Sequence, residues 1–300
     1  MDIAVTGASG LIGSALTTAL RGDGHVVRPV GRRPSEDPRA VLWDPAAGRI
    51  DAAALEGVDA VVHLAGAGIG DKRWTAARKR EIEESRTKGT DLLARTLAGL
   101  DRGPATLLSG SAIGYYGDRG DEQLTEESSP GDDFLARVAQ RWEEAATPAS
   151  DAGIRTVLLR TGVVLTARGG ALGRLLPLLR LGVGGRLGSG RQWWSWISLD
   201  DEVGAIRHLL SADDVAGPVN LVAPEPATNA EITRALGAGL HRPTMLPVPR
   251  FGPSLLYGSE MADLVVFVSQ RIVGERLAAS GYTFTHRDVD SVAAAVAAGR

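Results

Sequence analysis

The sequence contains no cysteine, which excludes disulfide bonds, thiolate metal sites and a cysteine nucleophile. It also lacks an excess of charge of one sign, since 33 Lys and Arg residues against 36 Asp and Glu residues give a formal net charge of −3. Without a basic stripe, a nucleic-acid partner is not supported. No apolar run reaches the ~18 residues of a membrane span, and the N-terminus has no secretory pattern. We therefore expect a cytoplasmic protein that binds a small molecule and has neither a nucleic-acid nor a membrane partner.

What the sequence does contain is ordinary globular composition, with 44% hydrophobic and 23% charged residues in a chain of 300. This length is sufficient for one large domain with a smaller lobe. The five histidines are not spaced like metal ligands, so we expect no metal site.

Short apolar runs alternate with longer helical segments in the first half of the chain. Helical spacing is seen in Leu11–Leu20, in the long stretch from Thr75 to Leu100, and from Asp133 to about Ser150. The expected strands are Ile3–Thr6, His25–Val30, Asp59–Gly66, Thr106–Ala112 and Arg155–Leu165. Such alternation predicts βαβ units and therefore an α/β fold with a Rossmann-like, doubly wound parallel sheet.

The rhythm changes after about residue 166, where a stretch rich in glycine and arginine begins. We expect residues 1–166 to form the nucleotide-binding domain, with 197–215 returning to it. Residues 167–196 and 216–300 are expected to form a smaller α/β substrate lobe over the carboxyl edge of the sheet, where open α/β sheets hold ligands.

Three glycines, Gly7, Gly10 and Gly13, mark the junction between the first strand and the first helix. Glycine costs conformational entropy in regular structure, so this spacing calls for a reason. A strand, a glycine-rich turn and a helix let backbone N–H groups meet a pyrophosphate at a helix N-terminus, and Ser9 adds a hydroxyl beside the turn. The pattern predicts a dinucleotide site.

The end of the second strand distinguishes between the two nicotinamide dinucleotides. NAD-binding proteins usually carry an acid there, which accepts a hydrogen bond from the ribose 2′-OH. Here the strand ends in Gly31, Arg32 and Arg33, and the first acid is Glu36. A guanidinium matches a 2′-phosphate, so NADP is the expected cofactor.

At this point the chain resembles a known family, the extended short-chain dehydrogenase/reductases, and within it an atypical epimerase-like subgroup. The general motifs are TGASGLIG (6–13), HLAG (63–66), SGSAIGYYG (109–117) and RTGVVL (160–165). Those of the subgroup are IGDKRW (69–74), ESR (84–86), GYYGDRGDE (114–122), LGSGRQWWSWI (187–197) and PATNAEIT (226–233). They appear in order and cover nearly the whole chain.

The resemblance implies further cofactor contacts beside those expected from the turn and the arginines. It places them at Leu11, Ile12, Leu64, Ala65, Gly66, Arg86, Ser109, Arg160 and Gly162. Relatives often have asparagine at the position of Arg86. An arginine there either contacts the cofactor's phosphates or an anionic substrate, or it holds Glu84 or another acid in a structural network.

The sequence departs from the family at its catalytic pair. Active relatives carry Tyr-x-x-x-Lys on the helix after the serine-bearing strand, but alignment places Leu135 and Ala139 at those positions. Neither side chain moves a proton. Ser111, near the position of the family's catalytic serine, and Tyr115, a nearby phenol, are the candidate catalytic residues; Tyr116 more closely matches a loop-shaping tyrosine of relatives.

Two classes of function follow. One is an NADP-dependent, epimerase-like oxidoreductase acting on a small hydroxyl- or carbonyl-bearing compound. The alternative is a non-catalytic NADP(H)-binding redox sensor or scaffold, which the missing Tyr-x-x-x-Lys pair favours. A sugar-nucleotide epimerase is a weaker reading, since it normally uses the full pair and NAD.

Overall fold

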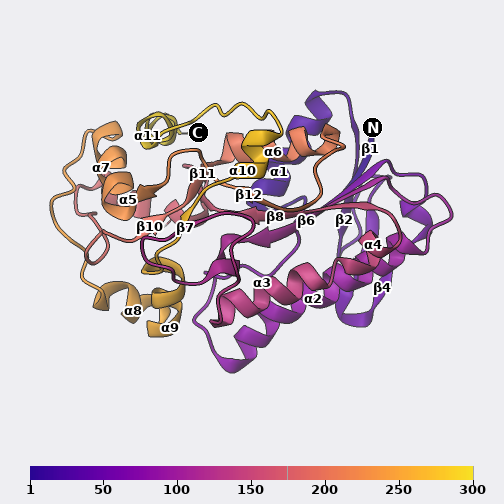
Figure 1. Ribbon diagram of the computed structural model, residues 1–300, viewed down its shortest axis with the longest axis horizontal. Helices are drawn as coiled ribbons and strands as arrows, with labels where there is room; N and C mark the ends of the chain where they lie inside the picture. Colours follow the sequence, from indigo (N-terminus) through magenta and orange to yellow (C-terminus); the bar gives the residue numbers. More distant parts are fainter. Residues whose placement is uncertain (174, 300) are drawn as a thin grey trace.

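An eight-stranded sheet forms the centre of the computed structural model, which describes residues 1–173 and 175–299 (Figure 1). Its strands, in spatial order, are β12 (Gly217–Leu221), β8 (Arg155–Thr161), β6 (Thr106–Ala112), β5 (Ala60–His63), β1 (Asp2–Thr6), β2 (Val26–Gly31), β3 (Val41–Asp44) and β4 (Arg49–Ile50). All neighbouring pairs are parallel except β3 with β4. The expected Rossmann-like α/β fold is confirmed.

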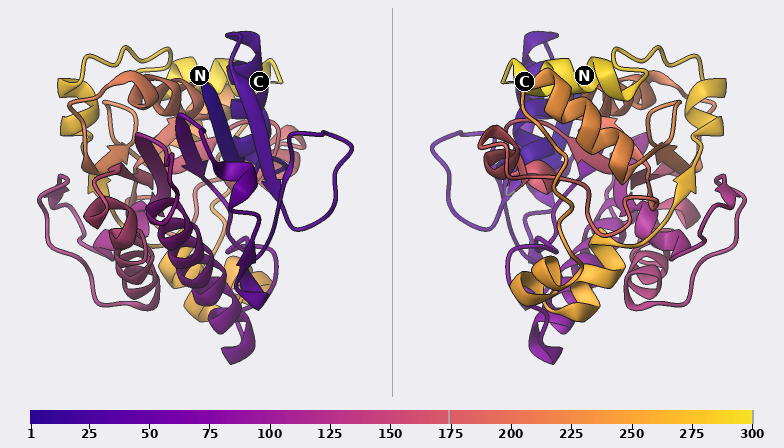
Figure 2. Two further views of the ribbon diagram at one scale, coloured as in Figure 1. Left: turned by 90° about the vertical axis from the view of Figure 1, so that its right-hand side faces the viewer. Right: turned by 90° about the vertical axis from the view of Figure 1, so that its left-hand side faces the viewer.

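Helices cover both faces of this sheet, as Figures 1 and 2 show. One face carries α1 (Leu11–Gly22) and α6 (Leu199–Ser211), and the other carries α2 (Ala76–Ala98), α3 (Phe134–Glu144) and α4 (Thr147–Asp151). Side chains alternate between the faces of a strand. In β1, Ile3 and Val5 therefore enter the core beneath α1 and α6, whereas Ala4 enters the core beneath α2.

The smaller lobe has a core of its own, which contains Leu176, Trp194, Trp196 and Leu236. Its helices are α5 (Leu175–Arg180), α7 (Asn229–Gly239), α8 (Phe251–Tyr257), α9 (Ser259–Met261) and α11 (Val289–Ala297). In contrast, α10 (Glu275–Ala279) packs on β12 and places Leu277 in the core of the main sheet. Short strand pairs join β9 (Val163–Leu165) to β11 (Trp196–Ser198), β10 (Trp193–Trp194) to β13 (Ala227–Thr228), and β7 (Gln123–Leu124) to β14 (Arg271–Ile272).

Helical turns of three to five residues complete the described chain: η1 (Pro45–Ala47), η2 (Ala53–Leu55), η3 (Ile113–Tyr116), η4 (Gly170–Leu172) and the π-helical η5 (Ala262–Val266). Within the described residues, no helix is long and apolar enough to cross a membrane.

The structure departs from the sequence-based expectations in several places. The expected strand 155–165 is divided at Gly162 into β8 and β9, because β9 pairs with β11 outside the main sheet. Residues 217–221 form β12 on the edge of the main sheet, although 216–300 were expected in the smaller lobe. The expected helix from Asp133 to about Ser150 is two helices, α3 and α4.

Candidate functional site

In the turn between β1 and α1, close backbone packing requires glycine at two positions, Gly7 and Gly13. Gly7 has φ +67°, and a Cβ there would lie 2.8 Å from the backbone carbonyl of Leu64. At Gly13 a Cβ would lie 2.1 Å from the carbonyl oxygen of Gly7. Because both contacts are with backbone, no side-chain movement relieves them. These two glycines bring the start of α1 and the ends of β1 and β5 together.

Gly10 is different, because it is exposed and packing alone does not require it. A Cβ would meet only the Gly7 carbonyl oxygen, at 3.2 Å. Gly10 is the N-cap of α1, and neither a side-chain cap nor an acid in the first turn satisfies this helix end. The first amides of a helix have no intrahelical acceptor and favour an anion. The Gly10 N–H already donates to the Gly7 carbonyl oxygen at 2.9 Å, so the amides of Leu11 and Ile12 are the ones that fit a phosphate, with exposed Ser9 beside them.

A buried hydrogen-bond network holds this turn against β5. Thr6 Oγ1 accepts bonds from the N–H groups of Leu64 and Ala65 at 3.0 and 3.1 Å, so its own proton is directed to His63 Nδ1 at 2.7 Å. His63 Nε2 then carries the proton and donates to Thr90 Oγ1 at 2.9 Å. Burial lowers the pKa of His63 to about 4, so the ring is neutral at pH 7.

Both arginines expected at the 2′-phosphate follow the last residue of β2 and are exposed. The exposed acid Glu81, on α2, has its pKa lowered first by a hydrogen bond from Arg78 and more weakly by the charges of Lys72 and Arg32. Arg32 therefore lies close enough to α2 for its charge to act on Glu81. Two exposed guanidinium groups at this position fit an additional phosphate.

A pocket of about 160 Å³ lies at the carboxyl ends of β6 and β8, between α3 and the smaller lobe. Its lining is mainly apolar. The residues are Ile69, Arg86, Ala112, Ile113, Gly114, Leu135, Val138, Ala139, Trp142, Gly162, Val163, Trp193, Trp194, Ser195, Leu264, Val265, Val268 and Gln270. Leu135 and Ala139, the residues aligned with the family's tyrosine and lysine, both line it. The pocket therefore occupies the place where relatives carry their catalytic pair.

Arg86 is the one charged residue among the described residues that line this pocket, and only 8% of it is exposed. Its Nη1 donates to the carbonyl oxygens of Ala67 and Ile82, each at 3.0 Å, and its guanidinium lies 4.9 Å from the ring centroid of Trp142. Burial, aided by the charge of Arg78, lowers the pKa of Arg86 to about 10, so it stays protonated at pH 7. The expected network with Glu84 does not form, since Glu84 pairs with Lys88.

Residues 64–66 connect the glycine turn with the pocket. Gly7 packs against Leu64 and Ala65, and a Cβ on the next residue, Gly66, would lie 3.3 Å from Cζ of Arg86. Arg86 in turn lines the pocket. A ligand that extends from the helix N-terminus past residues 64–66 therefore reaches the pocket.

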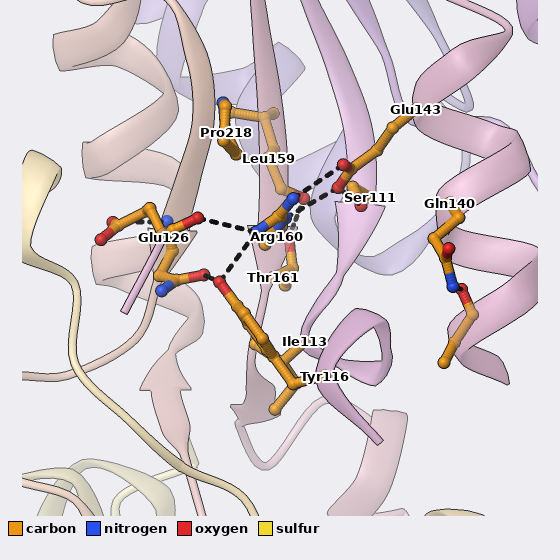
Figure 3. A network of polar contacts seen from close by, with 12 residues as sticks. Ser111, Ile113, Tyr116, Glu126, Gln140, Glu143, Leu159, Arg160, Thr161 and Pro218 are labelled. Carbon is orange, nitrogen blue, oxygen red and sulfur yellow. Dashed lines mark hydrogen bonds and ion pairs between the residues drawn. The ribbon is translucent and has the colours of Figure 1, made fainter. Parts of the chain in front are cut away.

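A second buried arginine is held in a polar network beside this pocket (Figure 3). Arg160, on β8, donates from Nε and Nη2 to the two carboxylate oxygens of Glu143, both at 2.8 Å. Ser111 Oγ donates to Glu143 Oε1 at 2.6 Å. Burial alone would lower the pKa of Arg160, but the hydrogen bonds and charge of Glu143 raise it. The Arg160–Glu143 ion pair is therefore held by residues of three elements: Ser111 on β6, Arg160 on β8 and Glu143 on α3.

The network continues to the edge of the sheet. Arg160 Nη1 donates to the Tyr116 hydroxyl at 2.9 Å, which donates to Asn220 Oδ1 at 2.7 Å. The Asn220 N–H donates to Glu126 Oε1 at 3.0 Å. Burial raises the pKa of Tyr116 to about 12. A fully buried phenol with both hydrogen-bonding roles satisfied is suited to holding structure.

The candidate catalytic residues lie in this network and not in the pocket lining. Ser111 is 5% exposed and bonded to Glu143. The Tyr115 ring lies against Arg160, whose Cζ is 3.5 Å from the ring centroid. The structure thus brings Ser111 and Tyr115 to one ion pair, Ser111 to Glu143 and Tyr115 to Arg160, while the neighbouring Ala112 lines the pocket. Their catalytic roles stay predictions.

Three of the residues expected to contact the cofactor, Arg160, Ser109 and Gly162, differ from one another in how accessible they are. Arg160 is 3% exposed and its donors are taken by Glu143 and Tyr116, which places it in a buried ion pair and not at an open cofactor surface. Ser109 is fully buried, with no partner for its hydroxyl among the described residues. Gly162, in contrast, lines the pocket, and a Cβ there would lie 2.7 Å from the Ser195 carbonyl oxygen.

Sequence reasoning missed the partners in this network, Asn220 and Glu126, and the pocket residue Gln270. An amide side chain in the middle of the apolar run PVNLV (218–222) is the signal that could have indicated a buried partner at Asn220. For Glu126 and Gln270, which lie in loop-like stretches, the sequence offers no comparable signal.

A doubly wound sheet with a glycine turn and an uncapped helix start after its first strand defines the class of a Rossmann-like α/β protein. Comparison with known proteins identifies the family. The model of the NAD dependent epimerase/dehydratase family matches residues 3–222, and a domain of unknown function (DUF1731) matches residues 248–296. The chain belongs to the NAD dependent epimerase/dehydratase family, which confirms the resemblance drawn from its motifs.

Curated relatives extend over almost the same length. Epimerase family protein Mb2239 of Mycobacterium bovis is 44% identical over 287 residues, which cover 96% of this chain and 94% of the relative. Human epimerase family protein SDR39U1 is 36% identical over 288 residues, covering 95% and 96%.

Solved structures agree. The crystal structure of human SDR39U1 (isoform2) with NADPH is similar with a TM-score of 0.91 at 34% identity and covers all of both chains. A nucleoside-diphosphate sugar epimerase from Corynebacterium glutamicum has a TM-score of 0.80 at 38% identity, over 99% of this chain and 58% of that chain.

Proposed function

We propose that this chain binds NADP(H) and transfers a hydride to or from a small carbonyl- or hydroxyl-bearing compound held in the apolar pocket. The observation that carries the proposal is the uncapped start of α1 at exposed Gly10, together with two exposed arginines where NAD-binding proteins carry an acid. The NADPH in the crystal structure of human SDR39U1 supports the choice of cofactor.

Each part of the site has a distinct task under this proposal. The amides at the start of α1 bind the pyrophosphate, and Arg32, assisted by Arg33, binds the 2′-phosphate. Residues 64–66 lie along the cofactor between the turn and the pocket. The nicotinamide supplies the hydride chemistry when it is bound. The apolar lining of the pocket excludes water from the reacting atoms.

Proton transfer is the step for which this pocket is poorly equipped. Among the described residues that line it, none is a carboxylate, phenol, imidazole or amine. General acid–base assistance is typically worth about 10²–10⁴-fold in rate. We therefore expect turnover to be slow compared with ordinary short-chain reductases, with Ser111 and Tyr115 as the nearby hydroxyls.

Cofactor preference tests the binding half of the proposal. NADPH and NADH are titrated by fluorescence into the wild type and into Arg32→Ala. Loss of one charge-assisted contact costs roughly 1.5–3 kcal/mol, so NADPH affinity should fall by about ten- to a hundredfold while NADH affinity stays unchanged. Arg39→Ala removes the same charge from an exposed position of the same loop and should bind like wild type. Equal affinities of the wild type for both dinucleotides would refute the assignment.

The second candidate function is a redox sensor or scaffold that binds NADP(H) without turnover. Leu135 and Ala139 favour it, since they replace proton-transfer groups with apolar side chains in the pocket itself. A screen of carbonyl and alcohol compounds that follows NADPH absorbance separates the two functions. Turnover of any compound supports the oxidoreductase, whereas tight NADPH binding with no turnover supports the sensor.

A further inference from the structure

Most polar groups around the pocket already have protein partners. Gln270 Nε2 donates to the carbonyl oxygens of Ile113 and Gly117, both at 3.0 Å. The indole N–H of Trp193 donates to Asp121 at 2.8 Å, and that of Trp194 to the Val266 carbonyl at 3.1 Å. Trp193 and Trp194 therefore offer the pocket only their apolar faces, whereas the indole N–H of Trp142 is enclosed without a partner among the described residues. A sugar, whose many hydroxyls each need a partner, would find few here.

Arg86 is the charged group of the lining that keeps open donors. Its Nη1 is occupied by the two backbone carbonyls, but among the described residues neither Nε nor Nη2 has a hydrogen-bond partner. Neither atom is among the fully enclosed polar atoms without a partner, so this edge of the guanidinium stays accessible. Arg86 forms no salt bridge with an acid among the described residues, and the like charge of Arg78 acts on it. A buried cation of this kind favours an anionic ligand.

The open edge of Arg86 has the shape of a carboxylate site. Nε–H and one Nη2–H are parallel donors that match the two oxygens of a carboxylate. Arg160 uses this same edge on Glu143, with both bonds at 2.8 Å. The protein thus already contains, on β8, the arrangement that Arg86 would form with a ligand.

We propose that the pocket takes a small, largely apolar carboxylic acid, whose carboxylate is held by Nε and Nη2 of Arg86 and whose body packs on the tryptophan-lined wall. A volume of about 160 Å³ matches a single ring or a short branched chain, because a cavity of about 150 Å³ accommodates benzene. The inference rests on the proposed function, in which this pocket is the substrate site beside the cofactor.

The test uses benzoate and its neutral isostere benzamide as probes. Both are titrated by calorimetry into the full chain, with and without saturating NADPH, and NADPH affinity is measured separately. Wild type should bind benzoate about tenfold or more tightly than benzamide, as expected for a charge-assisted bidentate contact. This comparison needs no variant. Equal affinities, or binding of neither probe, overturn the inference and leave measured NADPH binding intact.

Variants then identify the arginine. Arg86→Gln should remove the preference for benzoate while changing NADPH affinity less than about threefold. Arg86→Lys, which keeps the charge without the fork and guards against a folding failure, should retain part of the preference. Arg80→Gln removes the same charge from an exposed position on the same helix and should behave like wild type.

The two remaining outcomes have separate meanings. Loss of NADPH affinity in Arg86→Gln, but not in Arg80→Gln, would show that Arg86 binds the cofactor's phosphates and would overturn the carboxylate site. Failure of wild type to bind NADPH would refute the proposed function, whatever the benzoate result.

Discussion

His63 should make the stability of the fold, and of the glycine turn in particular, sensitive to mild acid. Its ring is fully buried between Thr6 and Thr90, and burial lowers its pKa from 6.5 to about 4. Between these values the unfolded chain binds a proton that the folded chain does not. Stability is therefore complete above pH 6.5 and falls as the pH falls toward 4.

The size of this loss of stability follows from the lowered pKa of His63. A displacement of about 2.5 pKa units, at about 1.36 kcal/mol each, amounts to about 3.4 kcal/mol in total. Linkage places about 2 kcal/mol of this loss between pH 7 and pH 5. Protonated His63 would also lose its acceptor Nδ1, so the Thr6 hydroxyl that holds Leu64 and Ala65 would lose its partner.

Urea unfolding at pH 7, 6 and 5 measures this contribution. Carboxylates elsewhere also respond to acid, so the informative quantity is the difference in unfolding free energy between wild type and His63→Gln. Wild type should lose about 2 kcal/mol more than the variant between pH 7 and pH 5. The exposed control His241→Gln should follow the wild-type profile. Parallel profiles for wild type and His63→Gln would refute the reasoning.

Three further outcomes are expected. Glu143→Gln leaves its buried arginine partner uncompensated and should cost about 3 kcal/mol in urea unfolding, against about 0.5 kcal/mol or less for the exposed pair broken by Glu84→Gln; equal costs would contradict the buried-pair argument. Gly10→Val should weaken NADPH binding in calorimetry while the chain stays folded, whereas Gly13→Ala, with its Cβ 2.1 Å from a carbonyl oxygen, should lower the melting temperature; unchanged binding in a folded Gly10→Val would refute the phosphate site. Tyr115→Phe should slow any NADPH-linked turnover and leave NADPH affinity intact, and an unchanged rate would remove Tyr115 from the mechanism.

Most strands of the sheet and the helices that cover it could be predicted, because their hydrophobic patterns extend over many residues and glycine or polar residues mark their ends. The expected strand Thr106–Ala112 matches β6, and Thr75–Leu100 contains α2. The strands β3 and β4 were missed, since they are four and two residues long and depend on tertiary pairing. The stretch WDPAAG (43–48) carried a turn signal, and Gly48 there has φ +64°.

The site was predictable where chemistry depends on the local backbone and less so where it depends on side chains distant in sequence. The glycine turn follows from its own residues. The pairing of Arg160 with Glu143 does not, because a guanidinium fits a cofactor phosphate and a carboxylate equally well. The choice between them is made by the packing of α3 against the sheet, which brings Glu143 within 2.8 Å.

The loss of the catalytic pair takes on a different meaning once the pocket is seen in three dimensions. On α3, Leu135 and Ala139 remove a phenol and an ammonium group from the pocket wall. On α2, Arg86 places a protonated guanidinium in the wall of the same pocket, more than 40 residues earlier in the chain. The pocket therefore still carries a positive charge, as it does in relatives with the lysine. Here, however, the charge belongs to a guanidinium, which does not readily give up its proton. Such a site is better suited to orienting an anion beside the cofactor than to moving protons, which is why binding selectivity tests it more directly than turnover does.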